Sequence, residues 1–239
     1  MAIYKVAELY LEFTPKYEHL KEYAEKYLYT GEYDPDDVIN LDVPQGFFEK
    51  KQKENPYLSV AMCEYIWMGA IFALKLLERK GFVIHASAVA YEGYAYLFSA
   101  DSGTGKSTHT GFWQEVFGAD KAVILNDDKP AVREIDGRFC ASGTMFSGKS
   151  PLSDDITVPV KALCFIHRSE QNEIKRLSVG EALPLLFEQT LRPRRSEKIL
   201  ELTEILDGFL RSVPVYSLGV TYSPDSARFA YEALQRSYS

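Results

Sequence analysis

The first third of the chain carries one clear helical pattern and little other regular periodicity. Residues 7–13 alternate apolar and polar side chains for most of their length, which predicts an early strand. Residues 15–55 are rich in Tyr, Glu, Lys and Asp without a clean period, so short helices and loops are expected there. The apolar residues of Pro56–Arg79 almost encircle a helix, which indicates burial, and Lys80-Gly81 ends it.

After residue 80 the pattern changes to short apolar strands that alternate with amphipathic helices. Strands are predicted at Phe82–Ala90, Ala95–Ser99, Ala122–Leu125, Ala131–Ile135, Arg138–Ala141, Val160–His167 and Val215–Val220. Helices are predicted over about ten residues from Lys106, over Ser178–Gln189 and Ser196–Val213, and from Ser223-Pro224-Asp225 onward.

This order of elements predicts the fold class and the domain organisation. Strands and helices alternate, as in α/β proteins, but Asp136-Gly137 fits a type I′ hairpin turn, so the sheet is expected to be mixed. Repeats and low-complexity linkers are not seen. We therefore predict a single domain over residues 1–239, with a core at about 82–220 and an N-terminal elaboration at 1–80.

Charge and cysteine content narrow the classes of function. The formal net charge is −7, and no basic run is longer than Arg192–Arg195, so nucleic acid is not an expected partner. The three cysteines and four histidines are scattered, which indicates neither a disulfide framework nor a zinc site.

A membrane location is not expected either. The longest apolar run, Tyr65–Leu74, is bounded by charged residues and is shorter than the roughly 20 residues that span a bilayer. The first residues do not have the pattern of a signal peptide. We therefore expect a cytoplasmic protein.

The segment after the predicted strand Ala95–Ser99 has the composition of a phosphate-binding loop. It matches GxxxxGK[ST] except at its first position, and a strand precedes it and a helix follows it, as the mechanism requires. The backbone N–H groups would surround a phosphate, Lys106 would reach between the β- and γ-phosphates, and the Ser107 hydroxyl would ligate Mg²⁺. The predicted nucleotide-binding residues are Asp101, Ser102, Gly103, Thr104, Gly105, Lys106, Ser107 and Thr108. The alternative is a Gly/Ser-rich surface turn before a helix.

Ala100 is the departure from that motif, because it stands where the first glycine is expected. If the position requires a positive φ, alanine costs about 1 kcal/mol or more and weakens phosphate binding. If φ is negative there, alanine is nearly harmless.

Two adjacent carboxylates follow the predicted strand Ala122–Leu125. Asp127 and Asp128 lie about twenty residues after Lys106, and ligands of open α/β sheets collect at the carboxyl ends of strands. A nucleotide site of this kind needs carboxylates for Mg²⁺ and a base for the acceptor. One carboxylate is expected to hold metal while the other faces the acceptor. A turn built from Asn-Asp-Asp is the alternative interpretation.

The run from His85-Ala-Ser-Ala-Val through Gly93 and Ala-Tyr-Leu-Phe-Ser-Ala-Asp-Ser-Gly-Thr-Gly-Lys-Ser-Thr108, followed by Asn126-Asp127-Asp128, resembles the HPr kinase/phosphorylase family. It is most similar to the short HPr-kinase-related proteins, which share a P-loop fold with phosphoenolpyruvate carboxykinases. Gly143–Gly148 also resembles a Gly-Thr-Pro…Gly segment of these relatives, with Met145 in place of the proline. The resemblance covers about residues 82–220 and does not place residues 1–80.

The resemblance implies a mixed-sheet P-loop fold of the HPr kinase C-terminal domain or phosphoenolpyruvate carboxykinase type. It also implies that His85, on the strand before the phosphate loop, lies beside the catalytic aspartate, and that Asp127 and Asp128 act in metal binding and as the base for a hydroxyl group. The expected cofactors are accordingly ATP and Mg²⁺, with Ser107, Asp127 and Asp128 as metal ligands. The C-terminal signature for docking HPr is not recognised in this chain, so HPr is not the expected substrate.

The sequence therefore predicts an ATP-dependent kinase with Asp127, Asp128 and His85 as catalytic residues. The acceptor is left open among a protein, a peptide and a small-molecule alcohol, and so is the oligomeric state, although members of the family tend to form homo-oligomers. A nucleotide hydrolase and a non-catalytic nucleotide-binding module in a larger assembly are the alternatives. His109 and Trp113, on the helix after the loop, either contact nucleotide or pack.

Overall fold

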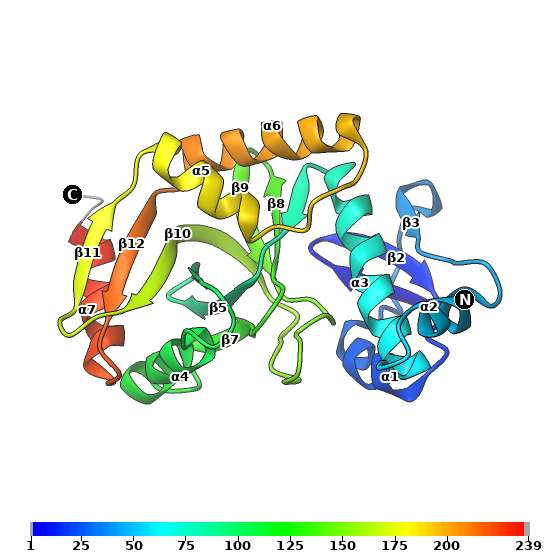
Figure 1. Cartoon of the computed structure of the whole chain (residues 1–239), viewed down its shortest axis with the longest axis horizontal. Coiled ribbons are helices and arrows are strands. Elements are labelled where there is room, and N and C mark those ends of the chain that lie inside the picture. Colours follow the sequence, from blue (N-terminus) through cyan, green and yellow to red (C-terminus); the bar gives the residue numbers. More distant parts are fainter. Residues whose placement is uncertain (1, 237–239) are drawn as a thin grey trace.

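The computed structural model describes residues 2–236, and a curled, mixed β-sheet forms the larger part of the molecule (Figure 1). Within residues 2–236 this sheet has nine strands, seven of them in the order β4-β8-β9-β10-β6-β5-β7, with β12 beside β10 and β11 beside β12. The strands are β4 (Gly81–Val83), β5 (Ala86–Tyr91), β6 (Tyr94–Ser99), β7 (Val123–Asn126), β8 (Ala131–Ile135), β9 (Arg138–Ser142), β10 (Thr157–Arg168), β11 (Glu173–Arg176) and β12 (Val215–Val220).

The sheet curls because β10 belongs to two differently paired regions. Its first residues, 157–159, pair antiparallel with β9, whereas residues 160–168 pair parallel with β6 and β12. The register shifts between Val160 and Ala162, directly after Pro159, whose nitrogen cannot donate to a ladder. The mixed α/β class expected from the Asp136-Gly137 hairpin is thus confirmed, and that turn has φ of +49° and +75°, as type I′ requires.

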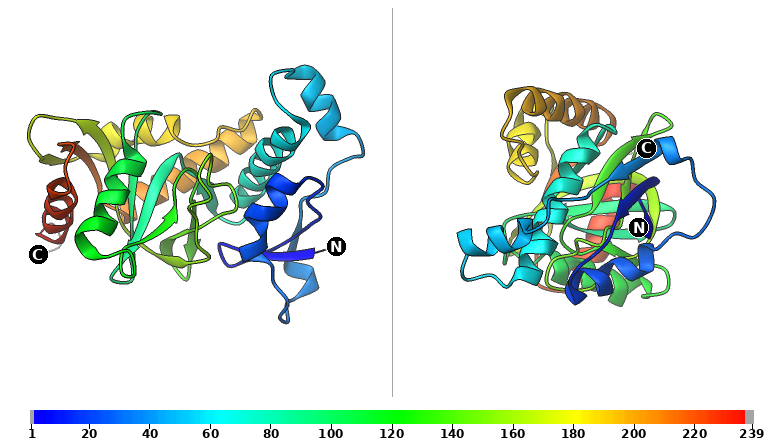
Figure 2. Two further views of the ribbon diagram at one scale, coloured as in Figure 1. Left: turned by 90° about the horizontal axis from the view of Figure 1, so that it is seen from below. Right: turned by 90° about the vertical axis from the view of Figure 1, so that its right-hand side faces the viewer.

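Helices cover both faces of this sheet. α5 (Val179–Glu188) and α6 (Ser196–Ser212) bury one apolar cluster against it, around Leu186, Leu206 and Phe209. α4 (Lys106–Phe117) and α7 (Asp225–Arg236) bury a second cluster around Trp113 and Leu218. Figure 2 shows these helices on opposite sides of the strands.

The N-terminal residues build a smaller unit with its own sheet. β1 (Ala2–Val6) and β2 (Leu9–Phe13) form a hairpin, and β3 (Val38–Asn40) pairs parallel with β2. Two helices, α1 (Glu18–Ala24) and α2 (Phe47–Glu54), and two short 3₁₀ turns, residues 25–27 and 35–37, connect to α3 (Val60–Leu77). The buried carboxylate of Glu64 on α3 accepts from the amides of Lys16 and Tyr17, at 2.6 and 2.9 Å, which fixes the chain before α1.

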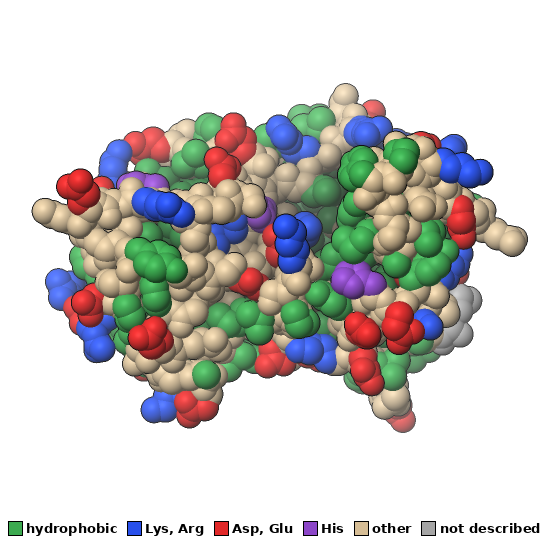
Figure 3. All heavy atoms as spheres, turned by 60° about the horizontal axis from the view of Figure 1, so that its bottom comes forward, with side chains coloured by type: hydrophobic (Ala, Val, Ile, Leu, Met, Phe, Trp, Pro, Cys, Tyr) green, Lys and Arg blue, Asp and Glu red, His purple; other side chains and the backbone are tan. Residues whose placement is uncertain are grey.

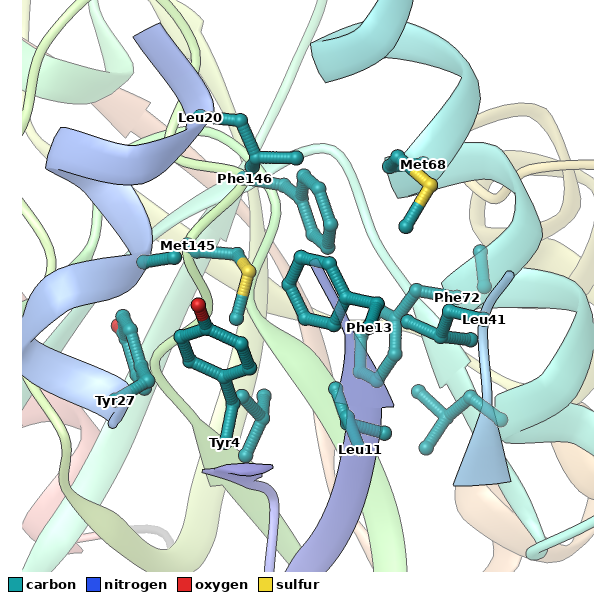
Figure 4. Packing of buried hydrophobic residues seen from close by; sticks show 14 of the residues in the cluster. Tyr4, Leu11, Phe13, Leu20, Tyr27, Leu41, Met68, Phe72, Met145 and Phe146 are labelled. Atoms are coloured by element: carbon teal, nitrogen blue, oxygen red, sulfur yellow. The ribbon is translucent and has the colours of Figure 1, made fainter. Parts of the chain in front are cut away.

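Two side chains from the larger part fill the space between the N-terminal sheet and α3. Met145 and Phe146, in the segment between β9 and β10, lie among Phe13, Leu20 and Phe72 (Figure 4). Both are almost fully buried, with 1% and 3% of their surfaces exposed. The N-terminal unit therefore shares one apolar core with a loop of the nine-stranded sheet.

The same segment is held to the N-terminal unit by polar contacts. Lys26 Nζ donates to the Ser153 carbonyl, and the Tyr27 hydroxyl is hydrogen-bonded to Ser153 Oγ. Burial raises the pKa of the Tyr27 phenol, which therefore stays protonated over the physiological range.

α3 is long and apolar enough to cross a membrane by length and composition alone. In the structure 44% of this helix is buried, and it packs against α1, α2 and β4. A core helix of a soluble protein passes the same test of length and composition.

Two strand predictions need correction. The predicted strand 7–13 is the second arm of a hairpin that begins at residue 2, because Ala7 and Glu8 both take positive φ and turn the chain. The predicted strand Phe82–Ala90 is two strands, β4 and β5, which break at Ile84 and His85 and pair with different neighbours. β11 was not predicted.

Candidate functional site

The loop between β6 and α4 is open, and most of its amides have no protein acceptor. Gly103 and Gly105 have φ of +82° and +116°, in the left-handed region that favours glycine. Within residues 2–236 the N–H groups of residues 102, 103 and 105–108 donate to no protein group, whereas that of Thr104 donates to the Asp101 carbonyl at 3.3 Å. Free amides that converge at the N-terminus of a helix suit an anion such as a phosphate.

Two cations lie against this loop. Lys106 is only 7% exposed, and its Nζ donates to the carbonyls of Ala100 and Asp101 at 2.9 and 3.3 Å. Burial lowers the pKa of Lys106, while the carboxylates of Asp128, Asp127 and Asp101 act in the opposite direction. Arg168, at the end of β10, donates to the carbonyl of Gly103 at 3.2 Å and so fixes the loop from outside.

Ala100 does not strain the loop. The non-glycine residues with positive φ within residues 2–236 are Ala7, Glu8, Lys80, Glu92 and Asp136. Because Ala100 is not among them, a missing first glycine carries no backbone penalty at this position.

Asp127 follows β7, where a hydroxyl from β5 fixes its carboxylate. Ser87 Oγ donates to Asp127 Oδ1 at 2.7 Å, and Thr110 Oγ1 of α4 lies 2.7 Å from the same Ser87 oxygen. A carboxylate only accepts, so Ser87 uses its single hydrogen on Asp127, while the Thr110 hydroxyl has the Ser87 oxygen and the carbonyls of Lys106 and Ser107 as acceptors for its own. These contacts join Asp127 to the helix that begins at the phosphate loop.

His85 lies beside Asp128, with its Nε2 3.4 Å from Asp128 Oδ1. The prediction placed His85 on a strand, whereas it occupies the bend between β4 and β5. There the Ile84 and Ala86 amides donate to the carbonyls of Pro130 and Asp128, so this bend runs along the chain that follows β7. Asp128 is also paired with Lys129, whose Nζ lies 3.0 Å from Oδ2.

Gln189, directly after α5, joins the pair of His85 and Asp128 to the phosphate loop. Its Oε1 lies 2.9 Å from His85 Nδ1, and its Nε2 donates to Asp101 Oδ1 at 3.2 Å. Because an amide oxygen only accepts, His85 carries a proton on Nδ1 and turns Nε2 toward Asp128.

Asn126 shapes the turn that carries both aspartates. Its Oδ1 accepts from the amides of Asp128 and Lys129 at 3.0 and 2.7 Å, and its Nδ2 donates to the Thr144 carbonyl at 3.0 Å. Gly148 approaches this turn closely, since a Cβ at that residue would lie 2.8 Å from Asp128 Oδ2.

Two cavities adjoin the site. One, of about 200 Å³, lies beside the phosphate loop and is lined by Thr104, Gly105, Thr108, Phe112, Arg168 and Tyr222 among others. The other, of about 290 Å³, lies between α3 and the residues after α5 and is lined by both His85 and Gln189. Figure 3 shows a hollow between the two parts of the molecule, where basic, acidic and His side chains gather.

His109 is a core residue that also lines the cavity beside the phosphate loop. It is 2% exposed, its Nε2 accepts from Trp113 Nε1 at 3.3 Å, and its Nδ1 lies 3.2 Å from Ser226 Oγ. Burial lowers the pKa of His109 to about 3, so it is neutral at physiological pH. Trp113 is fully buried and packs, whereas His109 packs and also lines the cavity of about 200 Å³ beside the phosphate loop.

The structure thus brings His85, Asp127 and Asp128 together with the loop that contains Lys106, Ser107 and Thr108. Sequence reasoning did not identify Ser87, Gln189 or Arg168. Ser87 could have been noticed as a hydroxyl residue within an otherwise apolar strand, two positions after His85. Nothing in the sequence near Gln189 marks it as part of a site.

A protein-family model described as SynChlorMet cassette protein ScmC matches residues 50–223, which include every residue of the site described above. The chain belongs to this family. A comparison with curated proteins found no match.

Among solved structures, the chain matches the HPr(Ser) kinase/phosphatase from Coxiella burnetii. The TM-score is 0.38 at 9% sequence identity, over 65% of this chain and 95% of that one. A likeness of this extent indicates neither an activity nor a site. The finer assignment of the ScmC-family sheet to the HPr kinase or phosphoenolpyruvate carboxykinase type stays a prediction, as does the single-domain organisation.

Proposed function

We propose that this ScmC-family protein is an ATP-dependent phosphotransferase that moves the γ-phosphoryl group of ATP to a hydroxyl group. The observation that carries the proposal is the series of contacts from Asp101 through Gln189 and His85 to Asp128. It links a loop of free amides to an acid–base pair, the combination that phosphoryl transfer needs.

The nucleotide would lie along the phosphate loop. The free amides of this loop would bind its β- and γ-phosphates, and Lys106 would exchange its two loop carbonyls for phosphate oxygens. The cavity of about 200 Å³ continues from Thr104 and Thr108 to the aromatic rings of Phe112 and Tyr222, and these rings suit a nucleobase.

Mg²⁺ suits the oxygen ligands beside this loop. Within residues 2–236 no group of three or more His, Cys, Asp or Glu side chains is arranged to hold a metal ion by itself. Mg²⁺ does not require one, because it binds nucleotide sites through one or two protein ligands together with phosphates and waters. Ser107 and Asp127 would hold it, with Asp128 nearby, and the ion would neutralise charge that develops on the phosphates.

Asp128 and His85 would serve the acceptor. Asp127 Oδ1 accepts from Ser87, whereas Asp128 Oδ1 faces an imidazole whose tautomer Gln189 fixes and its Oδ2 is paired with Lys129. Asp128 would accept the hydroxyl proton, and His85 would position its carboxylate.

A hydrolase with water as the acceptor and a non-catalytic nucleotide-binding module remain the alternatives. The sequence feature that favoured the non-catalytic module was Ala100, and its backbone conformation removes that reason. We further propose a cytoplasmic protein whose partners are the nucleotide and the acceptor, not nucleic acid or a membrane.

The decisive experiment incubates the purified chain with Mg²⁺ and γ-labelled ATP in an extract from its own source. Label in a protein or a small molecule supports the proposal, label only in free phosphate supports the hydrolase, and nucleotide binding without turnover supports the non-catalytic module.

Nucleotide binding is measured separately by thermal shift. A ligand at roughly 100 times its Kd stabilises by about 2.7 kcal/mol, and Lys106→Ala should remove most of that shift. Lys121→Ala, at an exposed lysine after α4, is the matched control and should leave the shift unchanged.

A further inference from the structure

The cavity of about 290 Å³ beside His85 is mostly apolar. α3 contributes Tyr65, Ile66, Gly69, Ala70 and Ala73, and the opposite wall comes from residues 188–191 together with Val83 and Phe146. It is smaller than the roughly 300–1,000 Å³ of pockets for drug-sized ligands, so it suits one large apolar group of a ligand.

Small residues on α3 create this space. Ala70 and Ala73 end at Cβ where a longer side chain would enter the cavity. Gly69 lets the Phe146 ring lie against the helix, since a Cβ there would be 3.1 Å from Phe146 Cδ1. The cavity is therefore bounded by a helix and a ring that the shared apolar core holds in place.

Two polar residues of the lining connect the cavity to the aspartates and the phosphate loop. His85 and Gln189 line the cavity, and their side chains also contact Asp128 and Asp101 respectively. Lys129 is a lining residue as well, and it is paired with Asp128. At the rim, Ile66 and Leu191 are 41% and 43% exposed, which extends the apolar surface outward.

We propose that this cavity binds the phosphoryl acceptor, and that the acceptor carries a large aliphatic or aromatic group next to its hydroxyl. The inference rests on the proposed phosphotransfer and specifies its substrate class. With the apolar group in the cavity, the hydroxyl lies at His85 and Asp128. The hydroxyl oxygen forms the new bond to the γ-phosphorus, the bond from that phosphorus to the β–γ bridging oxygen breaks, ADP leaves, and the hydroxyl proton passes to Asp128.

The test uses Mg-ATP and a panel of defined hydroxyl compounds. Acetyl-Ser-Phe-amide and acetyl-Ser-Leu-amide represent a peptide source, phenylserine represents a free hydroxy acid, and acetyl-Ser-Gly-amide lacks the apolar group. Binding is measured by saturation-transfer NMR without ATP, and transfer by γ-label incorporation. Affinity and kcat/KM should be roughly 10- to 100-fold higher for the compounds with an apolar group than for acetyl-Ser-Gly-amide. The source whose compound has the higher kcat/KM, peptide or free acid, identifies the natural one.

Two variants tie that preference to the cavity. Ala70→Leu fills the space, so compounds with and without the apolar group should bind and react about equally well. The thermal shift with ATP should be unchanged. Ile66→Ser should weaken the preference for apolar compounds in part. Leu74→Ser should leave that preference unchanged, because Leu74 lies on the same helix with similar exposure but outside the cavity lining.

The outcomes separate the two proposals. A binding preference that Ala70→Leu removes, without transfer to any compound, supports the cavity assignment and contradicts phosphotransfer. Transfer that shows no apolar preference, or a preference that survives Ala70→Leu, overturns the cavity assignment and leaves phosphotransfer intact. Failure of all four compounds to bind also overturns it.

Discussion

At the scale of single residues, Gln189 determines how His85 meets Asp128. Its amide oxygen requires a proton on His85 Nδ1, and its amide nitrogen holds Asp101 of the phosphate loop. Gln189→Leu removes both contacts. Because partners that orient an acid–base group contribute about 10- to 100-fold, we expect kcat to fall by that amount with little change in nucleotide affinity.

The conservative variant distinguishes the two contacts of Gln189. Gln189→Glu keeps an acceptor at His85 Nδ1 but removes the donor to Asp101, so it should retain more of kcat than Gln189→Leu does. Gln171→Leu, at an exposed glutamine, is the control and should keep full activity. Full activity in Gln189→Leu would remove Gln189 from the mechanism.

Gly148 is a second residue whose role depends on a close approach. Its φ is +80°, and an added Cβ would lie 2.8 Å from both Cβ and Oδ2 of Asp128. Gly148→Ala should destabilise the fold by about 1–2 kcal/mol through its backbone and should also displace Asp128, lowering phosphotransfer at least roughly tenfold.

Gly137→Ala separates these two effects. Gly137 has a φ of +75°, and a Cβ added there would meet no atom within 4 Å, so it carries the same backbone penalty without the displacement. Urea unfolding should show the backbone penalty in both variants, with a larger loss in Gly148→Ala because of the contact with Asp128, and a kinase assay should show loss of activity in Gly148→Ala alone. Equal activities would mean that Asp128 does not need this approach.

At the scale of elements, α4 and α7 are joined by a buried imidazole. His109 accepts from Trp113 and contacts Ser226 of α7, and burial lowers its pKa to about 3, against an unfolded value of about 6.5. As the pH falls, the unfolded chain therefore binds a proton at His109 before the folded chain does. This contribution to stability is complete above a pH of about 6.5 and declines by about 1.4 kcal/mol per pH unit as the pH falls toward about 3.

His109→Gln removes this titration and keeps a polar side chain. The difference in unfolding free energy between wild type and variant, measured by urea unfolding from about pH 7 to about pH 4.5, should shrink as the pH falls. His167→Gln, at a half-exposed histidine on β10, serves as the control and should follow the wild type. A difference independent of pH would show that folding does not lower the pKa of His109.

Elements with local chemistry were predictable from the sequence, and elements fixed by distant partners were not. The capping box of Ser178 and Glu181 begins α5 as expected, and Asp136-Gly137 forms its hairpin. The turn at Ala7 and Glu8 lacks glycine, so a propensity argument does not find it. The break at Ile84 and His85 arises because β4 pairs with β8 and β5 pairs with β7, both far along the chain, which no local pattern records.

The residues of the candidate site also fall into those that the local sequence predicts and those that only distant contacts bring together. The phosphate loop and the aspartates were recognisable because amide geometry and metal chemistry demand particular residue types at fixed spacing. Gln189 reaches His85 across 104 positions of the chain and Ser87 reaches Asp127 across 40, and such pairs become visible only in three dimensions.

At the scale of the whole molecule, the segment between β9 and β10 serves both the core and the site. It carries Phe146, packed against Tyr65 and Phe72, and also Gly148, which abuts Asp128. The family match begins at residue 50, within α2, so β1–β3 and α1 lie outside it. The N-terminal sheet is thus attached to the family's common region through this segment and α3.

Phe146→Ala tests that attachment. Truncating a phenylalanine that is 3% exposed should lower the free energy of unfolding by about 3–5 kcal/mol, because the surrounding rings cannot close the cavity. Since the lost ring lies between the N-terminal sheet and α3, amide hydrogen exchange should accelerate most in β1–β3, before global unfolding. Phe139→Ala, which opens the other apolar cluster beside Phe209, should destabilise the chain without that local effect. Exchange that rises equally in both variants would show instead that the N-terminal sheet and the larger sheet unfold as one cooperative unit.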